Sequence, residues 1–154
     1  MAQFSFIPSS ESAELADDIR ELFQDLASTL RHDLRAYSGE YHPSLDVRET
    51  DGAVEVVVDV AGVPMEALRV LMREGVLIVA GEKAPLPGTA EQSYHLVERE
   101  FGRFARAVRL TGAFEIGQAH AHLSQGELTI VLPKMADRRG RAHRIAVTSG
   151  QPRA

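Results

Sequence analysis

The sequence of 154 residues contains no cysteine and no tryptophan, and it has no long run of apolar residues. Without cysteine the chain forms no disulfide, thiolate metal site or cysteine nucleophile, so its fold must depend on an apolar core. No apolar run reaches the roughly 18 residues that span a bilayer, and the N-terminus lacks a basic region followed by a hydrophobic stretch. We therefore expect a cytoplasmic protein with no membrane partner.

Charge is distributed unevenly along the chain. Residues 1–42 carry 3 Arg against 8 acidic residues, whereas residues 134–154 carry 6 basic residues against 1 acidic residue. The sequence changes character near Pro43 and Pro133, and its length fits one domain with appendages. We therefore predict an N-terminal helical segment at 1–42, a core domain at 43–133 and a C-terminal extension at 134–154.

The N-terminal segment has the apolar spacing of an amphipathic helix. Apolar residues recur three and four positions apart, which places them on one helix face. This face would either pack on its own domain or pair with other chains and with exposed apolar segments of other proteins. Its polar positions are mostly acidic, unlike the Lys- and Arg-rich face of a helix that lies on a membrane. The predicted face consists of Leu15, Ile19, Leu22, Phe23, Leu26 and Leu30.

From Pro43 onward the apolar period changes from 3.6 to 2, and turn residues separate short segments. Val54, Val56, Val58 and Val60 share one parity, so their strand has a core side. The run 76–80 is apolar on both faces, which predicts a central strand after a turn at Glu74-Gly75. This pattern is typical of an all-β antiparallel sandwich or barrel. Further strands are predicted from Leu68, Val70 and Met72; from Phe104, Val108 and Leu110; from Ala119, Ala121 and Leu123; and from Leu128, Ile130 and Leu132.

Two features of this predicted sandwich require more than packing. Arg106 shares the parity of Phe104, so its guanidinium faces the apolar side and needs a carboxylate or carbonyl partner, unless it extends to water at a sheet edge. Glu98, Glu100 or another chain could supply a carboxylate. The stretch 82–93 is a long excursion within a compact domain, and such excursions usually serve function or are disordered. The run 94–97 after it could be a short strand that joins a neighbouring sheet.

The residue order in segments 54–64, 76–83 and 98–106 resembles the α-crystallin domain of bacterial small heat-shock proteins. The segment 121–128 matches the family's A-x-x-x-n-G-V-L signature, except that Glu127 replaces Val. Ile145-Ala146-Val147 is similar to the family's I-x-I/V anchor. The resemblance covers residues 43–133 and, with the anchor, the C-terminal extension; five motifs in the family's order are specific together, although each is weak alone.

The resemblance implies an immunoglobulin-like sandwich and an ATP-independent holdase that binds unfolded client proteins, with no cofactor and no catalytic residue. It also implies homodimers that assemble into higher oligomers. In the bacterial branch the strand after the long loop is exchanged between partners, and Arg106 matches an arginine whose salt bridges help to set the assembly. The residues implied for the dimer interface are Leu45, Asp46, Val47, Tyr94, His95, Leu96, Val97, Glu98, Glu100 and Arg106.

The anchor also has a physical rationale. In an extended segment Ile145 and Val147 point to the same side and can fill two adjacent pockets. About 12 residues separate Pro133 from Ile145, a reach of up to roughly 40 Å, which is enough to contact a neighbouring dimer. An ordinary final strand is the alternative. The family places the receiving groove between two strands that here supply Leu68, Val70, Met72, Ala119, Ala121 and Leu123.

Three other classes of protein fit the sequence less well than the holdase that the resemblance implies. It has no phosphate-binding loop, nucleophile elbow or H-E-x-x-H motif of an enzyme, and His120 with His122 lacks a third metal ligand. A nucleic-acid binder could use the basic C-terminal tail, but the domain is acidic and has few aromatic platforms. A monomeric sandwich-type co-chaperone or adaptor is the third alternative, and the segment 94–97 and the Ile145 anchor argue against it.

Overall fold

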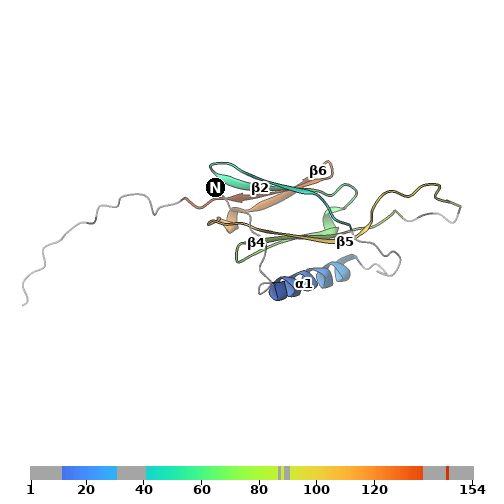
Figure 1. Ribbon diagram of the computed structural model, residues 1–154, viewed down its shortest axis with the longest axis horizontal. Coiled ribbons are helices and arrows are strands. Elements are labelled where there is room, and N and C mark those ends of the chain that lie inside the picture. Colours follow the sequence, from blue (N-terminus) through green and yellow to red (C-terminus); the bar gives the residue numbers. More distant parts are fainter. Residues whose placement is uncertain (1–11, 31–40, 87, 89–90, 137–144, 146–154) are drawn as a thin grey trace, which may run out of the picture.

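The computed structural model describes residues 12–30, 41–86, 88, 91–136 and 145. These residues form two antiparallel sheets that pack face to face, with one helix outside them (Figure 1). The predicted antiparallel sandwich with an N-terminal helix is therefore confirmed. The elements are α1 (Ser12–Leu30), β1 (Leu45–Glu49), β2 (Ala53–Asp59), β3 (Leu68–Arg73), β4 (Val76–Lys83), β5 (Gly102–Arg109), β6 (His120–Ser124) and β7 (Glu127–Pro133), with short 3-10 turns at Met65–Ala67 and Ile116–Gln118.

The first sheet has the strand order β1-β2-β7-β6, and the second has the order β3-β4-β5. In the first sheet β2 pairs with β7 over seven residues, from Ala53 opposite Pro133 to Asp59 opposite Glu127. Two tight turns close the hairpins β3–β4 and β6–β7, at Glu74-Gly75 and Gln125-Gly126, and both residues of each turn have positive φ. Such turns match the twist of the flanking strands, which explains the glycine in each.

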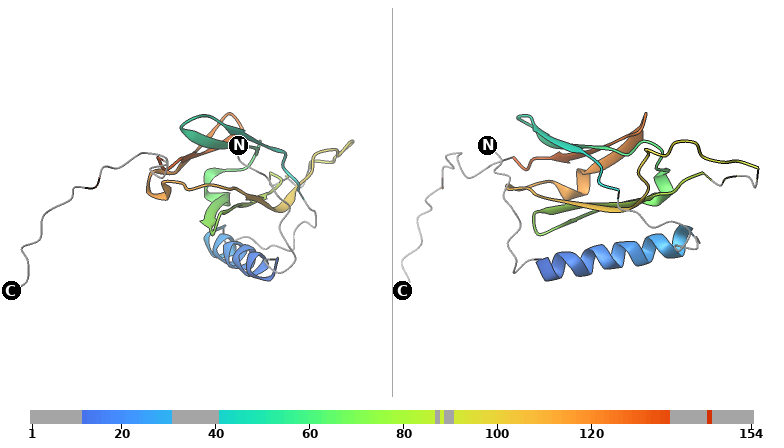
Figure 2. Two further views of the ribbon diagram at one scale, coloured as in Figure 1. Left: turned by 60° about the vertical axis from the view of Figure 1, so that its left-hand side comes forward. Right: turned by 45° about the vertical axis from the view of Figure 1, so that its right-hand side comes forward.

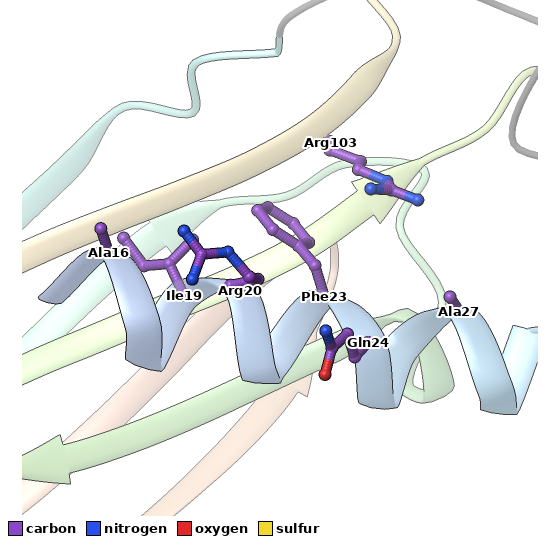
Figure 3. A pocket seen from close by; sticks show the side chains of 7 residues that line it. All are labelled: Ala16, Ile19, Arg20, Phe23, Gln24, Ala27 and Arg103. Atoms are coloured by element: carbon purple, nitrogen blue, oxygen red, sulfur yellow. The ribbon is translucent and has the colours of Figure 1, made fainter. Parts of the chain in front are cut away.

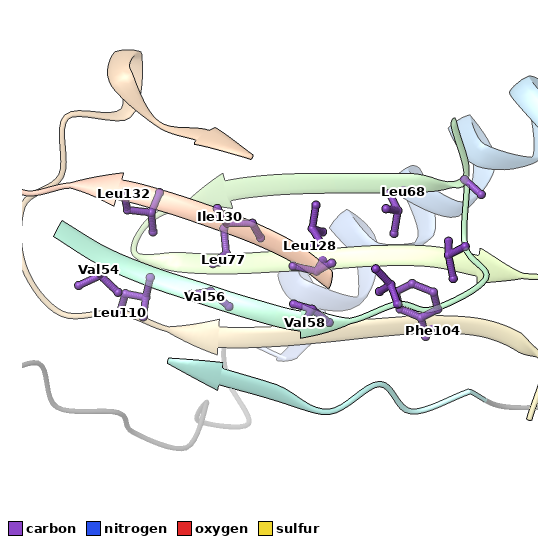
Figure 4. Packing of buried hydrophobic residues seen from close by; sticks show 14 residues of the cluster. Val54, Val56, Val58, Leu68, Leu77, Phe104, Leu110, Leu128, Ile130 and Leu132 are labelled. Atoms are coloured by element: carbon purple, nitrogen blue, oxygen red, sulfur yellow. The ribbon is translucent and has the colours of Figure 1, made fainter. Parts of the chain in front are cut away.

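The core lies between the sheets, as the alternating pattern predicts (Figure 4). Val54, Val56 and Val58 of β2 have no exposed surface, and Leu128, Ile130 and Leu132 of β7 are almost completely buried. These side chains point from the first sheet toward Leu77 and Phe104 of the second (Figure 4). The inward parity predicted for β2, β5 and β7 is therefore correct.

The central position predicted for the run 76–80 is also correct. β4 pairs with β3 on one side and β5 on the other. Its residues 77–80 are at most 1% exposed, although they alternate between the two faces of the sheet. The outer face is enclosed because α1 lies along the β3-β4-β5 sheet (Figure 2).

The end of β4 contains a close contact that the sequence pattern does not reveal. Gly81 lies opposite Phe104 in the β4–β5 pair. A Cβ atom at Gly81 would lie 2.4 Å from Cζ of Phe104 and 2.7 Å from the carbonyl oxygen of Ala67. Glycine therefore leaves the space that the Phe104 ring occupies.

We expect Gly81→Ala to lower the free energy of unfolding by about 1–3 kcal/mol, because the added methyl group overpacks the core. Gly52→Ala is the matched control, since a Cβ at Gly52 would have no neighbour within 4 Å. We expect the control to change stability by less than about 0.5 kcal/mol. Urea unfolding followed by circular dichroism measures both. Equal stability of the two variants would contradict the contact.

Candidate assembly interface

β1 forms one edge of the first sheet. It pairs with β2 along one side, and no described strand occupies its other side. Leu45 and Val47 lie opposite Val58 and Val56, so they face the core and are half-buried, whereas Asp46 points to the outer face. Within the described residues β1 is thus an edge strand, and an edge strand is the usual starting point for association with another strand.

The segment between β4 and β5, residues 84–101, is called the β4–β5 loop below. Its described part projects beyond the sandwich (yellow in Figures 1 and 2) and contains no strand. Tyr94 and Leu96 are about three-quarters exposed, and Val97 is 64% exposed. His95, Glu98 and Glu100 are exposed as well. Such a concentration of exposed apolar side chains is uncommon on a chain that stays monomeric.

Arg106 lies on the inward face of β5, opposite Val79, as its parity predicts. Its Nη1 donates a hydrogen bond to the carbonyl oxygen of Pro43 at 2.5 Å. Of the two partner types expected for this guanidinium, the carbonyl is therefore present within the chain. Among the described residues, neither Glu98 nor Glu100 forms an ion pair with it. Because Pro43 stands just before β1, this bond connects the start of β1 to β5.

An aromatic and cationic cluster lies at the base of the β4–β5 loop, and the sequence patterns do not predict it. Nζ of Lys83 lies 4.6 Å from the ring centroid of Tyr41 and 5.8 Å from that of Phe101. The Tyr41 hydroxyl donates to the carbonyl oxygen of Asp59 at 2.9 Å. No spacing rule connects these positions, which come together only because β1, β4 and β5 meet at this end of the sandwich.

Burial raises the pKa of Tyr41, and the negative charges of Asp59 and Glu100 raise it further. Both effects act in the same direction, because each disfavours the phenolate. Tyr41 therefore contributes to stability as the neutral phenol.

The edge strands β3 and β6 provide the predicted groove residues. The segment before β1 contacts β5, so the β1 edge of the first sheet lies over the β5 edge of the second. β6 is the opposite edge of the first sheet, and it therefore lies on the β3 side of the sandwich (Figure 4). On β3, Leu68 is buried, Met72 is half-buried and Val70 is 38% exposed. Ala119 and Leu123 pack against the core, and Ala121 is exposed. β6 begins at His120, one residue later than the pattern suggested, because the 3-10 turn at 116–118 precedes it.

The C-terminal anchor is described only in part. Ile145 is 85% exposed. Val147 lies outside the described residues, as do the arginines of the linker. Whether the anchor docks on β3 and β6 thus stays a prediction.

The predicted apolar face of α1 packs on its own domain, which is one of the two alternatives left open by the sequence. Leu26 is 2% exposed, and the other five residues of the face are half-buried. Arg69 and Arg73, on the outer side of β3, form ion pairs of 2.5 Å with Asp25 and Asp18 of the helix. The ion pairs and the apolar contact together hold α1 against the sheet.

One side of the helix face remains open toward β5. There the helix and Arg103 of β5 line a shallow hollow of about 390 Å³ (Figure 3). The Arg103 guanidinium lies 5.4 Å from the Phe23 ring centroid. This part of the helix face is thus still within reach of another chain.

Among residues 12–30, 41–86, 88, 91–136 and 145, no three His, Asp or Glu side chains gather as metal ligands would. His120 and His122 lie exposed on β6, and Nδ1 of His120 is 3.2 Å from the carbonyl oxygen of Gln118. In the same part of the chain, no helix has the length and apolar character required to cross a membrane.

Comparisons with known proteins place this sandwich in the class of small heat-shock proteins. The family model described as Hsp20/alpha crystallin family matches residues 46–148. The chain belongs to this family. Its similarity to heat shock proteins supports a chaperone role.

Three known proteins illustrate the similarity. The 18.9 kDa heat shock protein of Oryza sativa subsp. japonica is 37% identical over 107 residues, which cover 69% of this chain and 60% of the rice protein's own length. The structure of heat shock protein 16.0 from Schizosaccharomyces pombe has a TM-score of 0.62 and 31% identity, and the match covers 71% of this chain and all of that one.

The third is a small heat-shock protein from Xylella fastidiosa, whose structure has a TM-score of 0.62 and 26% identity. That match covers 71% of this chain and 98% of the other. The relatives come from a plant, a fungus and a bacterium, so they establish the family and leave the bacterial branch as a prediction.

We expect Tyr41→Phe to make the protein less sensitive to alkali. Since the pKa of Tyr41 is raised on folding, its stabilising contribution is fully present below the unfolded value of about 10 and is lost as the pH rises through the folded value. Unfolding free energies in urea at pH 8, 10 and 11 should therefore fall more steeply in the wild type than in the variant. At pH 8 the variant should lose about 1 kcal/mol with the hydrogen bond to Asp59.

Ser28→Ala is the matched control, because the Ser28 hydroxyl also donates to a backbone carbonyl, that of Asp25 at 2.8 Å, and the change removes no group that ionises in this pH range. Its pH profile should follow that of the wild type. Identical pH profiles for Tyr41→Phe and the wild type would contradict the raised pKa of Tyr41.

Proposed function

We propose that the protein is an ATP-independent holdase, which binds partly unfolded client proteins under stress and prevents their aggregation in the cytoplasm. On this proposal it is not an enzyme and needs no cofactor, because binding to the exposed apolar surface of a client is enough to prevent aggregation. The observation that carries the proposal is the presence, on one chain, of an open β1 edge and an exposed apolar loop.

The loop and the edge are complementary elements of a dimer. Tyr94, Leu96 and Val97 would lie along β1 of a partner chain, with backbone hydrogen bonds to residues 45–47. This pairing would satisfy the free side of β1 and remove exposed apolar surface from water in one step. Glu98 and Glu100 would then lie near the interface, where the partner's Arg106 is an available cation.

Dimers would assemble further through the C-terminal anchor. Ile145 is exposed in the single chain, and the edge strands β3 and β6 leave Val70 and Ala121 accessible. Each contact would bury little apolar area, so stability would come from many copies acting together. The similar small heat-shock protein from Xylella fastidiosa has a distinct high order structure, which supports assembly here.

Clients would contact the apolar face of α1. In the single chain this face is largely packed on the β3-β4-β5 sheet, and the part near Phe23 borders the open hollow. Warming would open weak contacts first, so the anchor groove and the helix face would become available when clients begin to unfold.

The holdase proposal is tested with a thermally aggregating client protein and no ATP. We expect the intact chain to suppress light scattering by the client at physiological salt, and we expect a form that ends at Pro133 to have the mass of a dimer. A monomeric intact chain without suppression would contradict both the dimer and the holdase. An affinity for RNA or DNA that salt abolishes would instead favour the basic tail as the functional element.

Replacing Ile145 and Val147 by Gly should convert the large oligomer to dimers, because the anchor loses both apolar side chains. Light-scattering mass at a fixed protein concentration measures the change. The matched control replaces Thr148 and Ser149 by Gly, which adds the same backbone freedom and leaves the anchor intact. An unchanged mass in the Ile145 and Val147 variant would rule out the anchor.

A further inference from the structure

Four side chains at the base of the β4–β5 loop form what we call the loop clamp: Tyr41, Lys83, Arg99 and Phe101. The Lys83 ammonium lies between two aromatic rings, 4.6 Å from the Tyr41 centroid and 5.8 Å from the Phe101 centroid. The Arg99 guanidinium lies 5.0 Å from the same Phe101 ring. These distances are within the range of cation–π attraction.

The clamp joins the two ends of the loop. Lys83 is the last residue of β4, and Phe101 is the residue before β5 begins. The backbone leaves the sheet at one of these residues and returns at the other. Their contact therefore adds a side-chain link between the two ends of the loop, beside the backbone pairing of Lys83 with Gly102.

The same clamp fixes the approach to β1. Tyr41 stands four residues before β1, and its ring meets Phe104 of β5 edge to face, with centroids 5.5 Å apart. Its hydroxyl is bound to the Asp59 carbonyl at the end of β2. Lys83 thus contacts both the base of the loop and the segment that leads into the β1 edge.

Lys83 is the buried member of the clamp, and its burial strengthens the attraction to the rings. Lys83 is only 8% exposed, and cation–π contacts are stronger where the cation has lost its water. The turn at Gly62 closes one side: a Cβ there would lie 3.5 Å from Nη2 of Arg99 and 3.6 Å from Cε of Lys83. The φ of Gly62 is +82°, a conformation that other residues rarely adopt.

From this geometry we propose that Lys83 is a positioning residue for strand exchange, which holds the β4–β5 loop and the β1 edge in the orientation that a second copy of this chain requires. This inference rests on the exchanged dimer proposed above. A loop without the clamp samples more directions, so more conformational entropy is lost when it pairs with a partner. The clamp lowers that loss before the partner arrives.

The test uses Lys83→Met in the full-length chain, a change that keeps a long unbranched side chain, one atom shorter, and removes its charge. Lys83→Arg restores a cation and should restore function. Arg20→Met is the matched control, because it also replaces a cation by Met and the ion pair of Arg20 with Asp17 on α1 is exposed and lies outside both the clamp and β1. Hydrogen exchange measured by mass spectrometry follows residues 45–49, 91–98 and the core strands, and mixing of isotope-labelled oligomers gives the rate of subunit exchange.

We expect Lys83→Met to raise the rate of subunit exchange about tenfold and to reduce protection in 45–49 and 91–98, with protection of β2, β4 and β7 unchanged. Lys83→Arg should return both readouts to within about twofold of the wild type, and Arg20→Met should stay within the same range. Wild-type behaviour of Lys83→Met would overturn the role of Lys83 and leave the exchanged dimer intact. Loss of core protection in Lys83→Met, without rescue by Arg, would also overturn it, because the residue would then act on the whole fold.

The wild type itself separates the two proposals. Protection of 91–98 in the wild-type chain supports strand exchange whatever the variants do. If the wild type shows no protection there and has the mass of a monomer, the exchanged dimer is wrong, and the positioning role that rests on it is wrong as well.

Discussion

The burial of β4 on both faces is the constraint on which the rest of the structure depends. Leu77 and Val79 face the other sheet, while Ile78 and Ala80 face outward and would meet water if α1 were absent. A sheet with two apolar faces needs a layer on each side, so the sandwich requires a helix. The ion pairs at Arg69 and Arg73 fix where that helix lies. They contribute little energy, since one partner of each is more than half exposed.

The edges of the two sheets differ in what they leave exposed. Within the described residues no strand pairs with the outer side of β1, while the edge strands β3 and β6 present partly exposed apolar side chains at the opposite margin. Backbone pairing is directional and fixes a register, while side-chain burial is weaker and tolerates sliding. On our proposal these two kinds of edge correspond to two levels of assembly, a firm dimer and a looser oligomer. The loop clamp acts on the first level only.

The sequence predicts the local features of this fold and misses its long-range contacts. Alternation identifies β2, β4 and β7 because burial repeats every second residue, and parity places Arg106 on the inner face. The same reasoning does not pair Lys83 with Tyr41, or Gly81 with Phe104, since these contacts depend on how distant strands meet. Whether Arg106 meets a carboxylate or a carbonyl also depends on geometry, and Pro43 supplies a carbonyl within the chain. The partner-dependent part of the site, residues 94–97 and the anchor, follows from resemblance rather than from periodicity.

The pairing of β2 with β7 affects how the chain folds during its synthesis on the ribosome. Ala53 and Pro133 are opposite each other in one sheet, so about half of the chain must be made between the two strands before they can meet. Until β7 leaves the ribosome, the wholly buried valines of β2 have no partner strand on that side. Non-local pairing of this kind folds slowly and exposes apolar strands during synthesis. A nascent chain in this state exposes the kind of apolar surface that the proposed holdase would bind.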